Sequence, residues 1–233
     1  MINNKKVLAF IPARGGSKGI KNKNIYEIHN KPLIAYSIDA ARNSKYVDDI
    51  IVSTYSENIK SVALEYGADV PFLRPSKLAT DTATTLDAVL HCVNYLKETG
   101  KEYDYFLLLQ PTSPLRSVDD IDAALEKFVA CGEKGLASIS EVVDHPVLIR
   151  KTVDGESMEK LLPLNSTVRR QDMPNFYRIN GSIYINLIEN INGQTSFNDN
   201  TVYYLMEKSH SVDIDDYADI ELVKYYMHVE ENR

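Results

Sequence analysis

Short apolar runs alternate with amphipathic stretches along the first half of the chain. The apolar runs are continuous, which is typical of strands that are buried on both faces of a sheet. They predict strands at 7–11, 49–53, 70–73 and 103–109. Between them apolar residues recur every three or four positions, and this spacing predicts helices at 31–43 and 57–66. Strands that alternate with helices in this way predict an α/β fold, with a mainly parallel central sheet that helices cover on both faces.

Polar residues that can cap a helix mark three further helix starts. A side-chain oxygen at the N-cap satisfies a free backbone N–H of the first helical turn. The candidate caps are Asp81 or Thr82, Ser117 or Asp119, and Asp215 or Asp216. The second half of the chain also contains strand-like segments at 136–143, 177–186 and 201–206. We expect the last of these to run antiparallel, near an edge of the sheet.

Residues 145–177 interrupt this regular pattern. They contain three prolines and an Asp154-Gly155 pair, which is typical of a turn. We interpret the segment as an inserted hairpin or arm of one domain that spans residues 1–233, and not as a separate domain.

Composition places the chain among ordinary globular proteins. It has 233 residues, 44% of them hydrophobic and 25% charged, and its net charge of −7 argues against general nucleic-acid binding. No apolar run approaches the roughly 20 residues that span a bilayer, and the first residues lack the apolar region of a signal peptide. The two cysteines, Cys92 and Cys131, lack metal-ligand spacing. These features predict a cytoplasmic protein with reduced thiols and no membrane partner.

A loop rich in glycine and cations follows the first predicted strand. Gly15, Gly16 and Gly19 allow tight turns and close approach to a ligand. From residue 14 to residue 31 the chain has one carboxylate and five cations, which are Arg14, Lys18, Lys21, Lys23 and Lys31. Such local positive charge in an acidic chain predicts an anion site, and phosphate is the common anion at a glycine-rich turn. The glycine spacing fits neither the Walker A loop nor the dinucleotide fingerprint, which disfavours a kinase or a dehydrogenase.

Two carboxylates stand near the other end of the chain. Asp213 and Asp215 alternate with Val212 and Ile214, so an extended backbone puts both acids on one face. Two carboxylates together with phosphate oxygens and water commonly hold magnesium. From the residues alone, a cap on the C-terminal helix by Asp215 or Asp216 is favoured over a metal site.

Six stretches of the sequence, in the same order, resemble the cytidylyltransferases that activate sialic acids, the CMP-N-acylneuraminate synthetases. They are IPARGGSKGIKNKNI, LATDTATT, LQPTSPLR, RRQDMP, YRINGSIYI and VDID. The resemblance implies a Rossmann-like nucleotidyltransferase fold and a reaction of CTP with an acidic nine-carbon sugar, which gives the CMP-sugar and pyrophosphate. It also implies magnesium, with manganese as an alternative, and a homodimer joined by the arm at 145–177.

The resemblance also implies roles for individual residues. For the nucleotide it implies Arg14, Gly15, Gly16, Ser17, Lys18, Lys23, Asn24, Arg74, Thr84 and Thr85. For the sugar it implies Gln110, Arg169, Arg170, Arg178 and Asn180. Asp213 and Asp215 are the implied metal ligands, and with Arg14 and Lys23 they form the implied catalytic set.

Simpler roles remain open for several of these side chains. Thr84 and Thr85 fit the first turn of a helix, and Arg169 and Arg170 fit a surface salt bridge. Leu148 stands where family members often carry a lysine, which leaves the sugar open between N-acylneuraminate, legionaminate, pseudaminate and the eight-carbon acid KDO. A non-catalytic nucleotide-binding protein with this fold is the more distant alternative.

Overall fold

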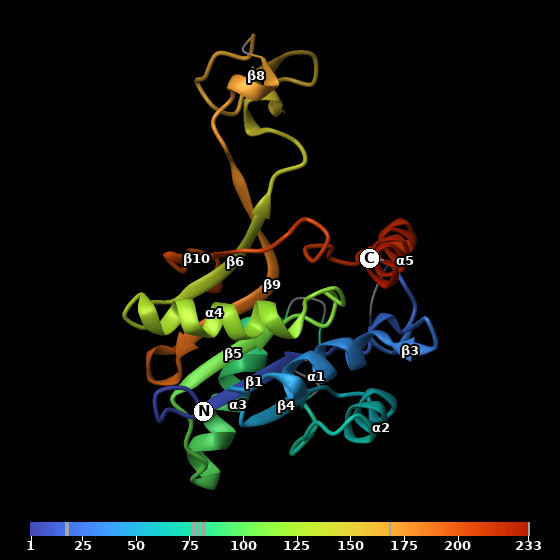
Figure 1. The fold of residues 1–233 in the computed structure, drawn as a ribbon, viewed down its shortest axis with the longest axis vertical. Helices are drawn as coiled ribbons and strands as arrows, with labels where there is room; N and C mark the ends of the chain where they lie inside the picture. Colours follow the sequence, from blue (N-terminus) through green and yellow to red (C-terminus); the bar gives the residue numbers. More distant parts are fainter. Residues whose placement is uncertain (17–18, 76–77, 79, 81–82, 168, 233) are drawn as a thin grey trace.

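The computed structural model describes residues 1–16, 19–75, 78, 80, 83–167 and 169–232. Its body is built on a six-stranded sheet with the strand order β10-β6-β9-β5-β1-β4 (Figure 1). The strands are β1 (Val7–Pro12), β4 (Asp49–Ser53), β5 (Tyr105–Leu109), β6 (Leu136–Glu141), β9 (Tyr177–Leu187) and β10 (Val202–Leu205). Within this sheet β9 is antiparallel to β5 and β6, and the other neighbouring strands are parallel. The prediction of an α/β fold with a mainly parallel sheet is confirmed.

Helices pack against both faces of this sheet. The α-helices of the described chain are α1 (Leu33–Asn43), α2 (Glu57–Glu65), α3 (Thr85–Thr99), α4 (Val118–Ala130) and α5 (Tyr217–Glu231). The short strands are β2 (Glu27–Ile28), β3 (Lys31–Pro32), β7 (Arg150–Thr152) and β8 (Met158–Lys160). Short 3-10 helices lie at Lys23–Ile25, Pro146–Leu148, Arg170–Asp172, Ile188–Asn190 and Phe197–Asp199. Among the described helices, none combines the length and the apolar character that a membrane span requires.

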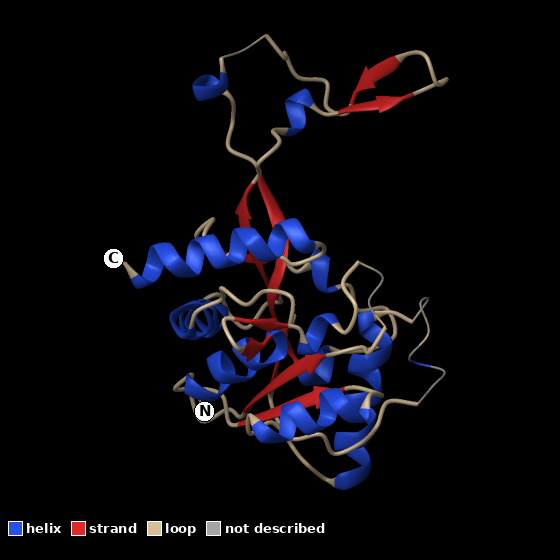
Figure 2. Ribbon diagram, turned by 90° about the vertical axis from the view of Figure 1, so that its right-hand side faces the viewer, coloured by secondary structure: helices blue, strands red, loops and turns tan. Residues whose placement is uncertain are grey.

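Successive residues of β1 enter two separate apolar clusters. Val7, Ala9 and Ile11 pack with residues of α1, α2 and α4, whereas Leu8 and Phe10 pack with residues of α3. All five side chains are fully buried. Helices therefore cover both faces of the sheet, as Figure 2 shows from the side and as the continuous apolar runs predict.

A third apolar cluster lies beside the sheet and joins segments from the two ends of the chain. Ile20 belongs to residues 14–24, here called the basic loop. Val212 and Ile214 flank Asp213 in residues 211–216, here called the acidic segment, and Ile220 lies on α5. These four apolar side chains are buried, and each contributes about 1.5–3 kcal/mol to the stability of the packed state. This cluster holds the acidic segment against the basic loop.

Helix caps follow the sequence in two cases and depart from it in one. Ser117 caps α4 and Asp216 caps α5, each in a reciprocal capping box. Thr84 caps α3, because its hydroxyl accepts the N–H of Asp87 and the Asp87 carboxylate accepts the N–H of Thr84. The predicted start of α3 is therefore wrong by two or three residues. The two residues that the sequence favours as its cap lie outside the described residues and are Asp81 and Thr82.

Two predicted strands also differ from the structure. β10 lies at the edge of the sheet as expected, but it runs parallel to β6 and not antiparallel. Because β9 runs opposite to β6, a chain that turns back after β9 comes alongside β6 in the parallel direction. Residues 70–73 form no regular strand in the described structure, and their region contributes two isolated bridges, Ile51 with Asp69 and Thr54 with Leu73.

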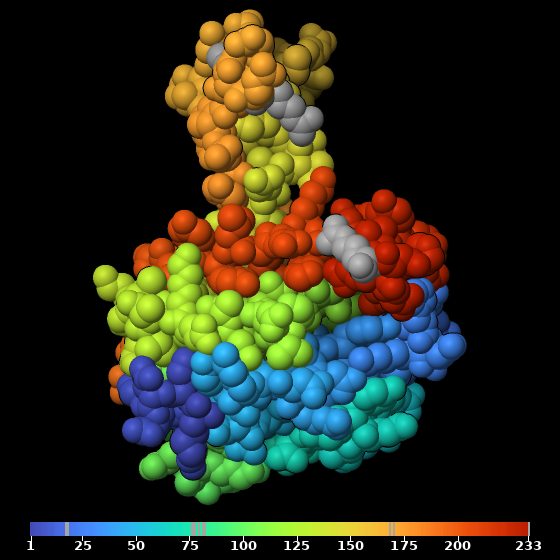
Figure 3. All heavy atoms as spheres, in the orientation of Figure 1, coloured from blue at the N-terminus to red at the C-terminus, as the bar shows by residue number. Residues whose placement is uncertain are grey.

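Residues 142–176, here called the arm, leave the body between β6 and β9 and project away from it (Figures 1 and 3). The arm contains the small hairpin of β7 and β8. In the loop between these strands the Asp154 carboxylate accepts hydrogen bonds from the N–H groups of Glu156 and Ser157, and Gly155 has a positive φ. The turn predicted at Asp154-Gly155 is confirmed.

Candidate active site

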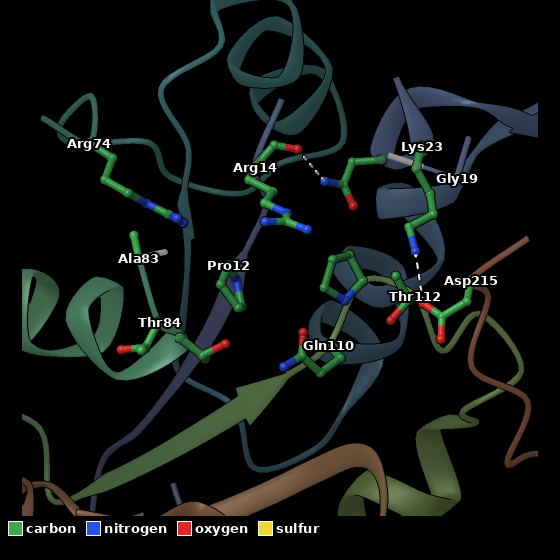
Figure 4. A pocket seen from close by; sticks show the side chains of 13 residues that line it. Pro12, Arg14, Gly19, Lys23, Arg74, Ala83, Thr84, Gln110, Thr112 and Asp215 are labelled. Atoms are coloured by element: carbon green, nitrogen blue, oxygen red, sulfur yellow. Dashed lines mark hydrogen bonds and ion pairs between the residues drawn. The ribbon is translucent and has the colours of Figure 1, made fainter. Parts of the chain in front are cut away.

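A cavity of about 380 Å³ lies at the carboxyl ends of the central strands (Figure 4). Pro12 ends β1 and Gln110 directly follows β5, so the cavity is where open α/β sheets bind ligands. The described residues that line it are Pro12, Arg14, Gly19, Lys23, Asn24, Arg74, Ala83, Thr84, Thr85, Gln110, Pro111, Thr112 and Asp215. Those that the sequence predicts as site residues are Arg14, Lys23, Asn24, Arg74, Thr84, Thr85, Gln110 and Asp215.

Lys23 links the basic loop to the acidic segment. Its Nζ donates a hydrogen bond of 2.5 Å to the carbonyl oxygen of Ile214 and lies 3.3 Å from Oδ1 of Asp215. The Lys23 side chain is 14% exposed, whereas that of Asp215 is 84% exposed. The carboxylate of Asp215 is therefore accessible to a ligand. The ammonium group of Lys23, which is hydrogen-bonded to the carbonyl oxygen of Ile214, lies beside it.

Gly19 lies directly against the backbone of Asp215. A Cβ atom at this position would be 2.5 Å from the carbonyl oxygen of Asp215, which is closer than real Cβ atoms approach. Close approach, and not a positive φ, is therefore the reason for glycine here. The basic loop and the acidic segment meet at a contact that a larger residue would open.

Arg14 and the two glycines after it take different positions. Arg14 stands at the cavity, and its carbonyl oxygen accepts a hydrogen bond of 2.8 Å from Nδ2 of the buried Asn24. Gly15 and Gly16 are not among the described residues that line the cavity, and the N–H of Gly16 donates to the hydroxyl of Tyr55 at 2.7 Å. The two other loop residues predicted for the nucleotide lie outside the described residues and are Ser17 and Lys18.

Arg74 approaches the cavity from the side opposite Lys23 (Figure 4). It is buried, and it donates from Nε to Oγ of Ser53 at 3.1 Å and from Nη2 to the carbonyl oxygen of Ser53 at 2.6 Å. Burial lowers the pKa of Arg74, and the charge of Arg14 also lowers it. Two guanidinium groups thus approach one cavity, an arrangement that suits a strongly anionic ligand.

The N-terminus of α3 forms the wall of the cavity next to Arg74. The hydroxyl of Thr84 takes part in the capping box with Asp87, so Thr84 is the N-cap of the helix and lies just before the first turn, in which the sequence places it. Thr85 is the first residue of the helix. The partial positive charge of a helix start favours an anionic group at this wall.

Asp213 lies next to the loop that follows β5. The N–H of Ile214 donates to the carbonyl oxygen of Thr112 at 2.9 Å, which fixes the acidic segment against this loop. Burial raises the pKa of Asp213 above its ordinary value, a hydrogen bond with Thr112 lowers it, and the charge of Asp215 raises it. Oδ1 of Asp213 is buried and has no hydrogen-bond partner among the described residues.

The two aspartates fit a divalent cation that takes few protein ligands. In the described part of the chain, no group of three or more His, Cys, Asp or Glu side chains is arranged to hold a metal ion. Magnesium commonly binds one or two carboxylates and completes its shell with phosphate oxygens and water. The unpartnered Oδ1 of Asp213 and the exposed carboxylate of Asp215 fit such a donor set.

The three residues on the body of the protein that are predicted to bind the sugar lie in different surroundings. Gln110 projects its side chain into the cavity (Figure 4). Arg178 is exposed, and its Nη2 lies 3.4 Å from the carbonyl oxygen of Ser211. Asn180 is buried and bonded on both sides of its amide, since Oδ1 accepts from Ser138 at 2.5 Å and Nδ2 donates to Oγ of Ser211 at 3.1 Å. Of these three residues, the structure places Gln110 in the cavity lining.

The predicted arginines of the arm lie apart from the cavity lining. Nε of Arg169 lies 2.7 Å from Oδ2 of Asp172, and the Arg169 side chain is 74% exposed. This is the surface salt bridge that the sequence allows as a simpler role. Arg170 begins a 3-10 helix, and its side chain lies outside the described part of the structure.

Several residues around the cavity were missed by reasoning from the sequence. Pro12 and Pro111 line it, and Tyr55 holds the basic loop through Gly16. Each of the three follows a predicted strand within two residues. The rule that ligands bind at the carboxyl ends of parallel strands is the signal that would have found them.

Comparisons with known proteins identify the family of the chain and agree with its fold. The family described as Cytidylyltransferase matches residues 8–233. The chain is 37% identical over 226 residues to the CMP-N,N'-diacetyllegionaminic acid synthase of Legionella pneumophila, with 95% of this chain and 96% of that protein covered. It is 36% identical over 219 residues to the N-acylneuraminate cytidylyltransferase of Escherichia coli O18:K1:H7, with 93% of this chain covered. The chain spans about half, 51%, of the length of that second relative.

A solved structure shares the fold at low sequence identity. It is a CMP:2-keto-3-deoxy-manno-octonic acid synthetase complexed with CTP, with a TM-score of 0.71 and 16% identity. The similarity covers 97% of this chain and 99% of that chain. The family match covers nearly the whole sequence, from residue 8 to residue 233. The chain belongs to the cytidylyltransferase family.

Proposed function

We propose that this cytidylyltransferase joins CTP to an N-acylneuraminate-type nine-carbon keto acid. The anomeric hydroxyl oxygen of the sugar attacks the α-phosphorus of CTP and loses its proton. The bond from that phosphorus to the bridging oxygen breaks, and pyrophosphate leaves. The observation that carries the proposal is the 3.3 Å contact between Lys23 and Asp215. It brings the basic loop, which suits phosphate, and a carboxylate that suits a metal ion to one cavity.

In this proposal the cationic side chains bind the triphosphate. Arg14 and Lys23 contact phosphate oxygens and stabilise the negative charge of the leaving pyrophosphate. Arg74 and the start of α3, with Thr84 and Thr85, hold the nucleotide at the opposite wall. Phosphoryl transfer depends mainly on positioning and charge stabilisation, so no covalent nucleophile of the protein is required.

Asp213 and Asp215 would hold Mg²⁺, or Mn²⁺, in this site. When bound, the metal neutralises phosphate charge and so lowers the repulsion that an attacking oxygen meets at phosphorus. Asp213 supplies a buried oxygen that has no hydrogen-bond partner among the described residues. Asp215 supplies an exposed carboxylate, and Lys23 keeps that carboxylate at the cavity.

The sugar acid would bind at the Gln110 side of the cavity. Gln110, whose side chain projects into the cavity, would donate to and accept from the sugar, and the exposed guanidinium of Arg178 would bind its carboxylate. Asn180 would act indirectly, since it holds Ser211 next to the acidic segment. Legionaminate is the second candidate substrate, because the legionaminic acid synthase of Legionella pneumophila is 37% identical to this chain over 95% of the chain's length.

The arm would join two copies of this single-domain chain into a homodimer. Large apolar side chains are exposed along it, and among the described ones are Val143, Leu148, Val153, Met158 and Leu161. Apolar surface of this kind is typical of an interface. In the dimer, Arg169 and Arg170 would reach the partner's sugar site. Met158→Glu with Leu161→Glu is expected to shift the sedimentation coefficient from dimer to monomer, and an unchanged dimer would contradict this use of the arm.

A panel of acid sugars tests the proposed reaction. The chain is mixed with CTP and Mg²⁺ and with N-acetylneuraminate, legionaminate, pseudaminate or KDO, and pyrophosphate release is measured. We expect release with N-acetylneuraminate. Release with only one of the other acids would identify that acid as the substrate. No release with any of the four would support a non-catalytic nucleotide-binding protein.

A further inference from the structure

Arg116 lies near the end of the loop that follows β5 and is a buried cation. Its side chain is 3% exposed, and in the described part of the chain it forms no salt bridge with a carboxylate. The carboxylate whose charge acts on Arg116 is that of Asp120, and its Oδ2 lies 2.8 Å from Nδ1 of His210. Burial lowers the pKa of Arg116 to about 9, so the group remains charged at neutral pH. A buried charge is costly, so its position calls for a reason beyond filling space.

The guanidinium joins three separate elements at one point. Nη1 donates to the carbonyl oxygen of Gln110 at 3.2 Å and to that of Ser182 on β9 at 2.8 Å. Nη2 donates to Oγ of Ser37 on α1 at 2.6 Å. Oγ of Ser37 in turn lies 3.3 Å from the same Gln110 carbonyl oxygen. Arg116 and Ser37 therefore hold the backbone carbonyl of Gln110, whose side chain projects into the cavity (Figure 4).

The same loop carries the contact that holds the acidic segment. Thr112 lies between Gln110 and Arg116, and its carbonyl oxygen accepts the N–H of Ile214 at 2.9 Å. The loop thus contacts both the cavity and the acidic segment, and the hydrogen bonds of Arg116 attach the loop to β9 and α1.

We propose that Arg116 is a positioning residue that sets the loop from Gln110 to Arg116 and, through Thr112, the place of Asp213 and Asp215. Its catalytic consequence rests on the proposed nucleotidyl transfer. Its structural consequence does not, because the contact between Thr112 and Ile214 exists without any substrate.

Arg116→Lys tests the structural part in the ligand-free protein. Lysine keeps the charge but lacks the fork that reaches Gln110, Ser182 and Ser37 together. We expect faster amide hydrogen exchange in residues 211–216 and in the loop, with exchange in α1 and β9 unchanged. Arg42→Lys, the same change on the surface of α1, is the matched control. Exchange that rises equally everywhere, or not at all, would overturn the positioning role.

The catalytic part is tested with the same variant. A misplacement of about 1 Å costs roughly a hundredfold in rate, so we expect kcat of Arg116→Lys to fall by about that factor while KM for CTP changes less than about threefold. A rise in KM without a fall in kcat would overturn it. If wild type itself releases no pyrophosphate, the proposed function fails and the exchange result still decides the role of Arg116.

Chemical rescue provides a second, independent variant. Arg116 also borders an outer pocket of about 360 Å³ beside Leu115 and Met227, which offers a small cation a route to the vacated space. For Arg116→Ala we expect methylguanidinium to restore pyrophosphate release at least tenfold, whereas neutral methylurea does not; a tenfold change corresponds to about 1.4 kcal/mol. Equal recovery with both compounds, or recovery with neither in a folded variant, would contradict the role of the guanidinium.

Discussion

Lys23 and Asp215 are 192 positions apart in the sequence, and their side chains lie 3.3 Å apart at the cavity. The backbone supports this contact on both sides, through the bond from Lys23 to the carbonyl oxygen of Ile214 and through Gly19 against Asp215. A buried apolar cluster with Ile20 and Ile214 lies behind it. The two charged segments therefore meet because apolar packing places them, and the predictions below follow from that arrangement.

Lys23→Ala removes the cation from the phosphate side of the cavity. A charge-assisted hydrogen bond contributes about 2 kcal/mol, so we expect KM for CTP to rise roughly thirtyfold. Steady-state kinetics with varied CTP measures this. The control is Lys45→Ala, which removes a surface lysine whose side chain is 59% exposed and pairs with Glu126. An unaltered KM and an unaltered rate in Lys23→Ala would count against its contact with phosphate.

Asp215→Asn keeps the shape of the side chain and removes its charge. Because the proposed metal binds this carboxylate, we expect turnover to fall by about a hundredfold or more. The thermal midpoint should stay within a few degrees of wild type, since the side chain is 84% exposed. Affinity for Mn²⁺ in the presence of CTP, measured by electron paramagnetic resonance, should also weaken. Full turnover with Mg²⁺ would reject the metal role.

Asp216→Ala changes the neighbouring carboxylate, which has a different role. Asp216 caps α5 by accepting the N–H groups of Ala218 and Asp219. Loss of such a cap costs about 1 kcal/mol, so urea denaturation should show lower stability by that amount. We expect kcat under folding conditions to remain near that of wild type. A loss of turnover as large as that of Asp215→Asn would show that the two roles are not separate.

Gly19→Ala tests the contact between the basic loop and the acidic segment. The added Cβ would start 2.5 Å from the carbonyl oxygen of Asp215, and real contacts stay beyond 3.0 Å. The loop or the acidic segment must move, and a displacement approaching 1 Å costs up to about a hundredfold in kcat/KM. Kinetics and circular dichroism on the same sample separate this effect from unfolding. A fully active Gly19→Ala would mean that the contact is unnecessary.

His210 links α4, α5 and the segment before Asp213 by charge. Nδ1 lies 2.8 Å from Oδ2 of Asp120, and Nε2 lies 3.2 Å from Oε1 of Glu230. The hydrogen bond to Asp120 raises the pKa of His210, burial lowers it, and the charges of Asp120, Glu230 and Glu207 raise it. Since the folded-state pKa is raised, this stabilisation is complete below the ordinary histidine value of about 6.5 and is lost as pH rises through the raised pKa.

The stability of wild type should therefore depend on pH more than that of His210→Gln. Between about pH 6 and about pH 9 we expect wild type to lose on the order of 1 kcal/mol more of its free energy of unfolding than the variant. Urea denaturation at several pH values measures this difference. Parallel curves for the two proteins over that range would show that His210 does not titrate in the way its contacts imply.

Local patterns in the sequence predict the elements and part of the site. Alternation of Val212 and Ile214 with Asp213 and Asp215 is matched in part by the structure. The two apolar residues are buried and Asp215 is exposed, whereas Asp213 is half-buried and is not among the described residues that line the cavity. The capping boxes at Ser117 and Asp216 are likewise short-range features that a few residues determine. Such features depend on neighbours within one turn or one strand, so the sequence alone specifies them.

Features that depend on distant segments could not be predicted in this way. The direction of β10 is set by its pairing with β6 across the sheet, and the burial of Asn180 is set by Ser138 and Ser211. The three anchors of Arg116 come from elements up to 79 residues away. A polar residue in a sequence motif can face either a cavity or a neighbouring element. Packing against distant segments decides which of the two it faces.

A crystal structure with CTP and Mn²⁺, recorded at the manganese absorption edge, tests the central claim most directly. We predict one anomalous peak about 2.1 Å from oxygens of Asp213 and Asp215, with the triphosphate between that ion and the side chains of Arg14 and Lys23. A nucleotide bound outside this cavity, or a manganese ion that contacts neither aspartate, would contradict the account.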